Sequence, residues 1–178
     1  VGIWMDEKGS GYLLSHFEPA VTSLDNVGWN PDGEHPMKEH FTLFEALQRS
    51  AQILSRLHSA GFIHGDAQIK NMAICNRGVR LVDLTSLRLL GSRDEERSLE
   101  LMSAMYRDIS TLIESVVKKG LLFSEEVASR HQVIKTMLIE PYLSILRHPS
   151  SELHQQYSSP DIHDDLEAIG EQLIKAIP

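Results

Sequence analysis

The sequence predicts an α+β fold that is mainly helical and carries short β-hairpins. Near the start, strand-like runs at residues 1–5 and 12–17 flank a turn that contains Gly and Ser. Two more short apolar runs, at residues 72–75 and 79–82, flank a second turn. Between and after these runs, apolar residues recur at three- and four-residue spacing, which is typical of helices that bury one face.

The first half of the chain reads as hairpin, linker and long helix. Residues 19–36 are rich in Asn, Asp, Gly and Pro, which predicts a loop, with a short helix near residues 23–27. A helix is predicted over residues 38–60, with Gly61 as its stop. The residues expected on its buried face are Phe44, Leu47, Ala51, Leu54 and Leu57.

Helical patterns fill the second half of the chain. They cover residues 95–106, 108–118, 124–138 and 162–177. The expected separators are Gly120, Pro141, Pro149 and Pro160. The break before residue 108 would place Asp108 at the start of a helix.

Composition excludes several classes of function. A net charge of −8 over 178 residues argues against sequence-independent binding of nucleic acid or anionic membrane, because both need clustered Lys and Arg. No apolar run approaches the roughly 20 residues that span a bilayer. The single cysteine, Cys75, permits no internal disulfide and favours a reduced, cytoplasmic setting. One domain is expected from this length.

A polar loop at residues 64–71 is the main candidate for chemistry. It reads His-Gly-Asp-Ala-Gln-Ile-Lys-Asn and fits the pattern H-x-D-x-x-x-x-N, and Asp83 follows at the end of the second short strand. Asp66 can accept the proton of a hydroxyl, while Asn71 and Asp83 offer the hard oxygen ligands that Mg²⁺ prefers. Phosphoryl transfer needs both a base and a bound metal ion, because the protein mainly orients the attacking hydroxyl and neutralises phosphate charge.

These residues resemble the kinase-like superfamily, especially its His-Gly-Asp branch of aminoglycoside, choline and lipopolysaccharide-core kinases. The resemblance implies that Asp66 is the catalytic base, that Asn71 and Asp83 hold Mg²⁺, and that His64 braces the loop. It implies a structural role for Asp108, whose carboxylate would accept backbone N–H groups of the loop. The implied activity is ATP- and Mg²⁺-dependent transfer of a phosphoryl group to a hydroxyl of a small molecule or sugar.

The resemblance also implies two unequal parts. Residues 1–18 look like the remnant hairpin and hinge of a small lobe, in which the backbone of His16, Phe17 and Glu18 would contact adenine. Residues 19–178 look like a protein-kinase-like C-terminal lobe. The glycine-rich loop and phosphate-binding Lys would precede Val1, so the N-terminal lobe is expected to be largely missing and this chain alone inactive. Its exposed hairpin could pair with another molecule and form a dimer.

The chain departs from regulated protein kinases at several positions. Gly65 stands where those kinases have Arg, Gln68 where they usually have Lys, and Leu84-Thr85 replaces Phe-Gly. No Ala-Pro-Glu follows. These differences favour a small-molecule or sugar acceptor over a protein.

Simpler interpretations remain open for each candidate residue. Residues 64–71 could form an ordinary polar turn, Asp83 could cap the turn after its strand, and Asp108 could only cap a helix. No zinc site is implied by the spacing of His35, His40, His58, His131, His148, His154 and His163.

For the whole chain, the alternative is a catalytically inactive kinase-like module that binds a nucleotide or a partner. The joint presence of Asp66, Asn71 and Asp83 favours the enzyme, because a binding module needs no base.

Overall fold

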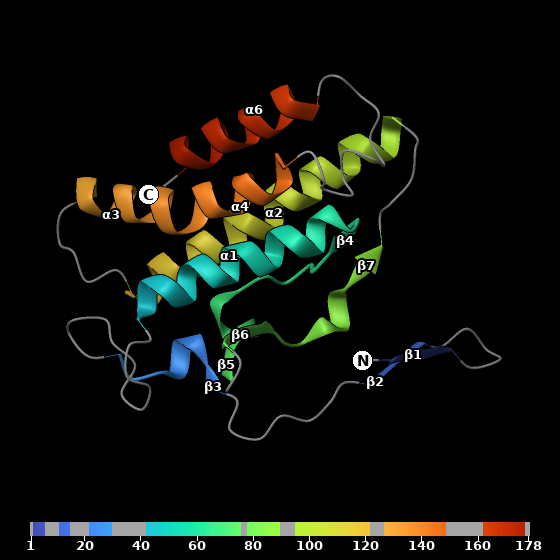
Figure 1. Cartoon of the computed structure of the whole chain (residues 1–178), viewed down its shortest axis with the longest axis horizontal. Helices are drawn as coiled ribbons and strands as arrows, with labels where there is room; N and C mark the ends of the chain where they lie inside the picture. Colours follow the sequence, from blue (N-terminus) through green and yellow to red (C-terminus); the bar gives the residue numbers. More distant parts are fainter. Residues whose placement is uncertain are drawn as a thin grey trace.

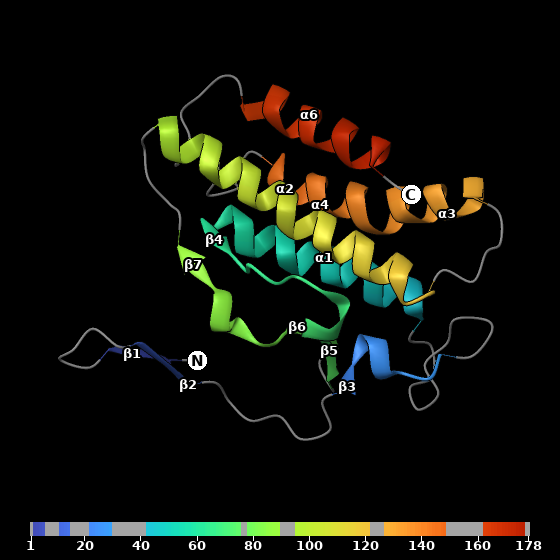
Figure 2. The ribbon, with the colours of Figure 1, turned by 180° about the vertical axis from the view of Figure 1, so that it is seen from behind.

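The computed structural model describes residues 2–5, 11–14, 22–29, 42–75, 78–89, 95–121, 127–148 and 162–176. Within these residues the protein is an α+β structure, which confirms the predicted class (Figure 1). Long helices stack on one another and small antiparallel sheets lie along one side, as the reverse view also shows (Figure 2). None of the helices in these ranges combines the length and the apolar character that crossing a bilayer requires.

Three small sheets are present in the described residues. Their strands are β1 (Gly2–Met5) with β2 (Gly11–Leu14), β3 (Thr22–Ser23) with β5 (Met72–Cys75) and β6 (Gly78–Leu81), and β4 (Phe62–Ile63) with β7 (Arg88–Leu89). The predicted N-terminal strand pair exists as β1 and β2, which Figure 1 draws apart from the helices. Its use as a dimer contact stays a prediction. Sequence reasoning missed the β3–β5 and β4–β7 pairs, because strands of two residues have no periodicity to detect.

The central helix α1 runs over Leu43–Ser59. It begins after Thr42, whose side-chain oxygen accepts the N–H of Glu45 at 3.2 Å, and residues 38–41 of the predicted helix lie outside the described residues. Its buried face contains Leu47, Ala51 and Leu54, as expected. Phe44 was wrongly placed there and is 43% exposed, because Leu43, one turn before Leu47, occupies the buried position.

Helix α2 (Glu95–Lys118) is one continuous helix. The prediction of two helices meeting before residue 108 was therefore wrong. No Gly or Pro occurs between residues 95 and 118, so nothing in the local sequence ends the helix at that point. Asp108 consequently lies well inside α2, and its role as an N-cap is excluded.

Pro141 does not separate helices as predicted. Helix α3 (Val127–Ile134), a π-helical turn (Lys135–Ile139) and α4 (Glu140–Leu146) follow one another directly, and Pro141 is buried in the first turn of α4. In the middle of a regular helix, a proline ring clashes with the carbonyl four residues earlier and lacks its own N–H. The wider turn before Pro141, in which the Glu140 N–H donates to the Lys135 carbonyl, accommodates it. The predicted last helix is present as α6 (Ile162–Lys175).

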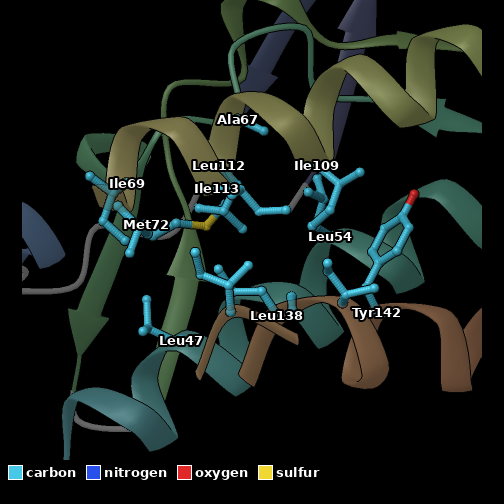
Figure 3. Packing of buried hydrophobic residues seen from close by; sticks show 14 of the residues in the cluster. Leu47, Leu54, Ala67, Ile69, Met72, Ile109, Leu112, Ile113, Leu138 and Tyr142 are labelled. Carbon is cyan, nitrogen blue, oxygen red and sulfur yellow. The ribbon is translucent and has the colours of Figure 1, made fainter. Parts of the chain in front are cut away.

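One hydrophobic core joins the helices to the polar loop. Helix α1 packs against α4 on one side and against β4 and β6 on another. Figure 3 shows loop residues Ala67 and Ile69, and Met72 at the start of β5, directed toward the same core as Ile109 and Leu112 of α2. All three residues are almost completely buried. Apolar side chains of the loop therefore anchor it to the hydrophobic core.

Candidate functional site

The loop at residues 64–71 connects β4 to β5 and has a backbone shape that requires glycine. Gly65 has a φ of +81°, and a Cβ at this position would lie 2.8 Å from the carbonyl oxygen of Ser86. The backbone of the segment that follows Asp83 therefore approaches the loop closely. Any larger residue at position 65 would push these two segments apart.

The carboxylate of Asp66 is held by neighbours within the loop. Gln68 Nε2 donates to Oδ1 at 2.7 Å, Asn71 Nδ2 donates to Oδ2 at 3.0 Å, and Lys70 Nζ lies 3.4 Å from Oδ2. Partial burial acts to raise the pKa of Asp66, but contacts with Gln68, Lys70 and Asn71 outweigh it and the net pKa is lowered. Asp66 is therefore a carboxylate at neutral pH, in the form that accepts a proton or hydrogen bond.

Asn71 presents an amide oxygen beside Asp66. Its Nδ2 donates both to the backbone carbonyl of Asp66, at 2.8 Å, and to Asp66 Oδ2. Because both partners can only accept, the nitrogen must face Asp66 and Oδ1 must face away. Among the described residues, no hydrogen bond reaches this oxygen. The side chain is buried and held in place, with one hard oxygen left available.

Asp83 follows β6 in an unusual backbone conformation. The strand ends at Leu81, so Asp83 lies two residues beyond it rather than at its end as predicted. With φ 55° and ψ 65°, Asp83 is the only described residue other than glycine that has positive φ. Such a conformation is uncommon and clusters at functional sites. Thr85 Oγ1 donates to Oδ1 at 2.7 Å, and the residue is exposed.

His64 and Val82 join Asp83 to the loop. The His64 ring is fully buried, its Nε2 donates to the Val82 carbonyl at 3.2 Å, and its Nδ1 accepts the Asp66 N–H at 3.3 Å. The Val82 N–H donates to the Asn71 carbonyl at 2.9 Å. The residue before Asp83 is thus bonded to both ends of the loop. Asp66, Asn71 and Asp83 belong to one hydrogen-bonded unit, which we call the loop unit and define as residues 64–71 with 82–83.

Asp108 braces the loop unit from helix α2. Its Oδ2 accepts the His64 N–H at 2.8 Å, and its Oδ1 accepts the Gly65 N–H at 3.0 Å. This is the contact that the resemblance implied, although it is made from the middle of a helix. The carboxylate satisfies the buried His64 N–H, which would otherwise be without a partner, and it also accepts the N–H of the exposed Gly65.

Two further residues complete the brace, and sequence reasoning missed both. His58 Nε2 donates to Asp108 Oδ2 at 3.1 Å, and the Tyr142 hydroxyl donates to His58 Nδ1 at 2.6 Å. His58 could have been noticed, because it follows Leu54 by four residues on the buried face of α1. Tyr142 has no such signal, since its contact depends on how α4 packs against α1.

The protonation states of this chain of contacts are set by burial. Burial lowers the pKa of His58, although the Asp108 carboxylate opposes the shift. Burial also raises the pKa of Tyr142 well above its ordinary value, and the Asp108 charge adds to that effect. His58 is therefore neutral and Tyr142 keeps its proton. Hydrogen bonds run in one direction, from Tyr142 through His58 to Asp108.

We expect the stability of the folded chain to decrease as pH falls below 6.5, the ordinary pKa of His58. The unfolded chain takes up a proton on His58 that the folded chain excludes, and the decline continues down to the lowered folded pKa. One such proton contributes a slope of up to about 1.4 kcal/mol per pH unit. Urea denaturation of the wild type at a series of pH values measures the slope.

The His58→Gln variant is the control for this expectation. Glutamine can donate to Asp108 but cannot titrate, so the variant should be less stable at neutral pH and show a flatter pH profile. The remaining histidines and the neighbouring His64, Asp108 and Tyr142 are unchanged, so they contribute to both profiles. Identical slopes in the two proteins would mean that His58 is not the group excluded from protonation.

Other parts of the predicted site can be placed only in part. His16, Phe17 and Glu18, expected to contact adenine, lie outside the described residues. Within the part of the chain that the structure covers, no three His, Cys, Asp or Glu side chains form a metal-binding group. Comparisons with protein-family models, curated proteins and solved structures found no match to this chain.

Proposed function

We propose that this chain provides the catalytic loop and metal-binding residues of an ATP- and Mg²⁺-dependent, kinase-like phosphotransferase. The acceptor would be a hydroxyl of a small molecule or sugar. The observation that carries the proposal is the loop unit, which combines an ionised carboxylate, Asp66, with the amide oxygen of Asn71 and the second carboxylate of Asp83. These are the three groups that the phosphotransfer pattern requires.

Asp66 is assigned to the acceptor hydroxyl. Phosphoryl transfer relies on positioning more than on covalent chemistry, so the base mainly needs to be ionised and correctly directed. Gln68, Lys70 and Asn71 hold the Asp66 carboxylate from three sides and keep its pKa low. A hydroxyl that donates to this carboxylate would be oriented for attack and would pass its proton there during transfer.

The donor set fits magnesium. Asn71 Oδ1 accepts no hydrogen bond from the described residues, and neither does Asp83 Oδ2. Mg²⁺ is usually held by one or two carboxylates plus waters and substrate phosphates, so a cage of three acidic side chains is not required. When bound, Mg²⁺ would neutralise charge on the nucleotide phosphates.

The brace behind the loop unit supports a catalytic role. An ordinary polar turn satisfies its own backbone groups, whereas this loop is bonded to Asp108, and Asp108 is bonded to His58. The amide of Ile69 also donates to Ser115 Oγ on α2, at 2.8 Å. Catalytic groups need this kind of support, because small displacements reduce rates strongly.

We expect Asp83→Ala and Asn71→Ala to weaken Mg²⁺-dependent nucleotide binding by at least about tenfold, since each variant deletes an oxygen ligand. Titration calorimetry with ATP at several Mg²⁺ concentrations measures the effect, using the protein expressed from its complete gene. The matched control is Asp164→Ala, which removes an exposed carboxylate from α6. Unchanged Mg²⁺ titrations for both site variants would contradict the metal assignment.

The same titration separates the enzyme from the alternative module. Mg²⁺-dependent ATP binding without phosphoryl transfer to any sugar, aminoglycoside or choline-like acceptor would favour an inactive nucleotide-binding module. Transfer that disappears in Asp66→Asn favours the enzyme.

A further inference from the structure

A groove of about 550 Å³ lies between α1 and β6 and is lined by residues other than those assigned above. Its lining consists of Arg49, Gln52, Ile53, Arg56, Val79, Arg80 and Leu81. The α1 residues recur at three- and four-residue spacing and therefore form one stripe of the helix. None of them belongs to the loop unit or its brace.

The groove has a charge opposite to that of the chain. Three arginines line it and none of its described lining residues is acidic, whereas the chain as a whole has a net charge of −8. A concave surface lined by groups of one charge concentrates their field. An anion placed there would make charge-assisted hydrogen bonds with the guanidinium groups.

The arginines are positioned by the protein. Gly78 has a φ of +110°, and a Cβ there would lie 2.8 Å from Arg49 Nη1, so the guanidinium lies against the backbone at the start of β6. Glu45 Oε1 contacts Arg49 Nη2 at 2.5 Å. Arg80 Nε donates to the buried Cys75 Sγ at 3.2 Å. These contacts orient two of the three guanidinium groups around the groove.

The size and lining of the groove indicate the class of ligand. Small-molecule sites typically measure about 300–1,000 Å³ and combine apolar walls with a few polar groups. Here Ile53, Val79 and Leu81 supply apolar surface. Each arginine has a planar guanidinium group, which can donate two parallel hydrogen bonds to the oxygens of one phosphate. We propose that the groove binds a small polyanion that carries two or more phosphate groups.

Tripolyphosphate without Mg²⁺ is the probe, titrated calorimetrically into the chain. We expect Arg56→Ala and Arg80→Ala each to weaken its binding by about tenfold or more, as expected for losing one charge-assisted contact. Arg147→Ala, which removes an exposed arginine at the end of α4, is the matched control and should bind like the wild type. Glu45→Gln should bind about twofold more tightly, because it frees the Arg49 guanidinium from a competing carboxylate.

The possible outcomes distinguish this site from the proposed phosphotransferase site. Asp83→Ala should bind tripolyphosphate as tightly as the wild type. Loss of binding in Asp83→Ala, with no loss in Arg56→Ala, would place the anion at the loop unit and overturn the groove proposal while leaving the proposed function intact. Equal weakening by Arg147→Ala would indicate nonspecific attraction and also overturn it. The absence of tripolyphosphate binding to the wild type would overturn it as well.

Discussion

Replacing Asp66 with asparagine is expected to lower the rate of phosphoryl transfer by roughly 10²–10⁴-fold, the usual contribution of a positioned base. Asparagine matches aspartate in size but cannot take the proton of the acceptor hydroxyl. Only one of its atoms accepts hydrogen bonds, whereas Gln68, Asn71 and Lys70 all approach the carboxylate as donors. The variant therefore also loses part of the orientation of residue 66.

Steady-state kinetics and nucleotide titration together test this expectation, in the protein expressed from its complete gene. Affinity for ATP should change little, because Asp66 is assigned to the acceptor and not to the nucleotide. Asp164→Asn, the same change on the exposed face of α6, should retain full activity. An Asp66→Asn rate within roughly tenfold of the wild type would contradict the assignment of Asp66 as the base.

Replacing Asp108 with alanine is expected to lower the free energy of unfolding by about 2–4 kcal/mol, because each buried donor that is left without a partner costs about 1–3 kcal/mol. The carboxylate is almost completely buried and accepts from the His64 and Gly65 amides and from His58. Its removal leaves the buried His64 amide and the buried His58 ring without this partner, and it also removes a partner of the amide of the exposed Gly65. The loss is larger than that of a helix cap, which is typically about 1 kcal/mol.

Urea denaturation at pH 7 measures this loss of stability, and two further variants serve as comparisons. Asp108→Asn retains one accepting oxygen and should be destabilised less than Asp108→Ala. Tyr142→Phe removes only the hydroxyl at the far end of the network and should lose about 0.5–1.5 kcal/mol. If Asp108→Ala is destabilised by no more than a helix cap, the loop amides do not depend on this carboxylate.

Several structural elements could be predicted because they depend on local sequence. The buried stripe through Leu47, Ala51 and Leu54 predicts α1, and the short apolar runs around residues 76–78 predict β5 and β6. Errors arose where local signals misled. Pro141 looked like a helix stop, yet the π turn before it lets the chain continue as α4. Phe44 looked buried, yet Leu43 holds that position.

The local sequence indicated the residue types of the candidate site, and the resemblance implied the contact between Asp108 and the loop, but the rest of the support was not predicted. Residues 64–71 and Asp83 show two carboxylates and one amide at the spacing expected for a base and two Mg²⁺ ligands. This spacing can be read directly from the local sequence. The hydrogen bonds of His58 to Asp108 and to Tyr142 join residues 50 and 84 positions apart, and neither was expected. No periodicity relates residues at such separations.

The sequence by itself therefore determined the mixed fold class, the order of its main elements and the chemical character of the loop at residues 64–71. Helix and strand periodicities and turn residues act over a few positions, so they can be read along the chain. Only the tertiary structure decided that Asp108 reaches the loop from mid-helix and that arginines of α1 and β6 share one groove. Those facts depend on how distant elements pack, because side chains meet there through the shape of the core and not through their spacing in sequence.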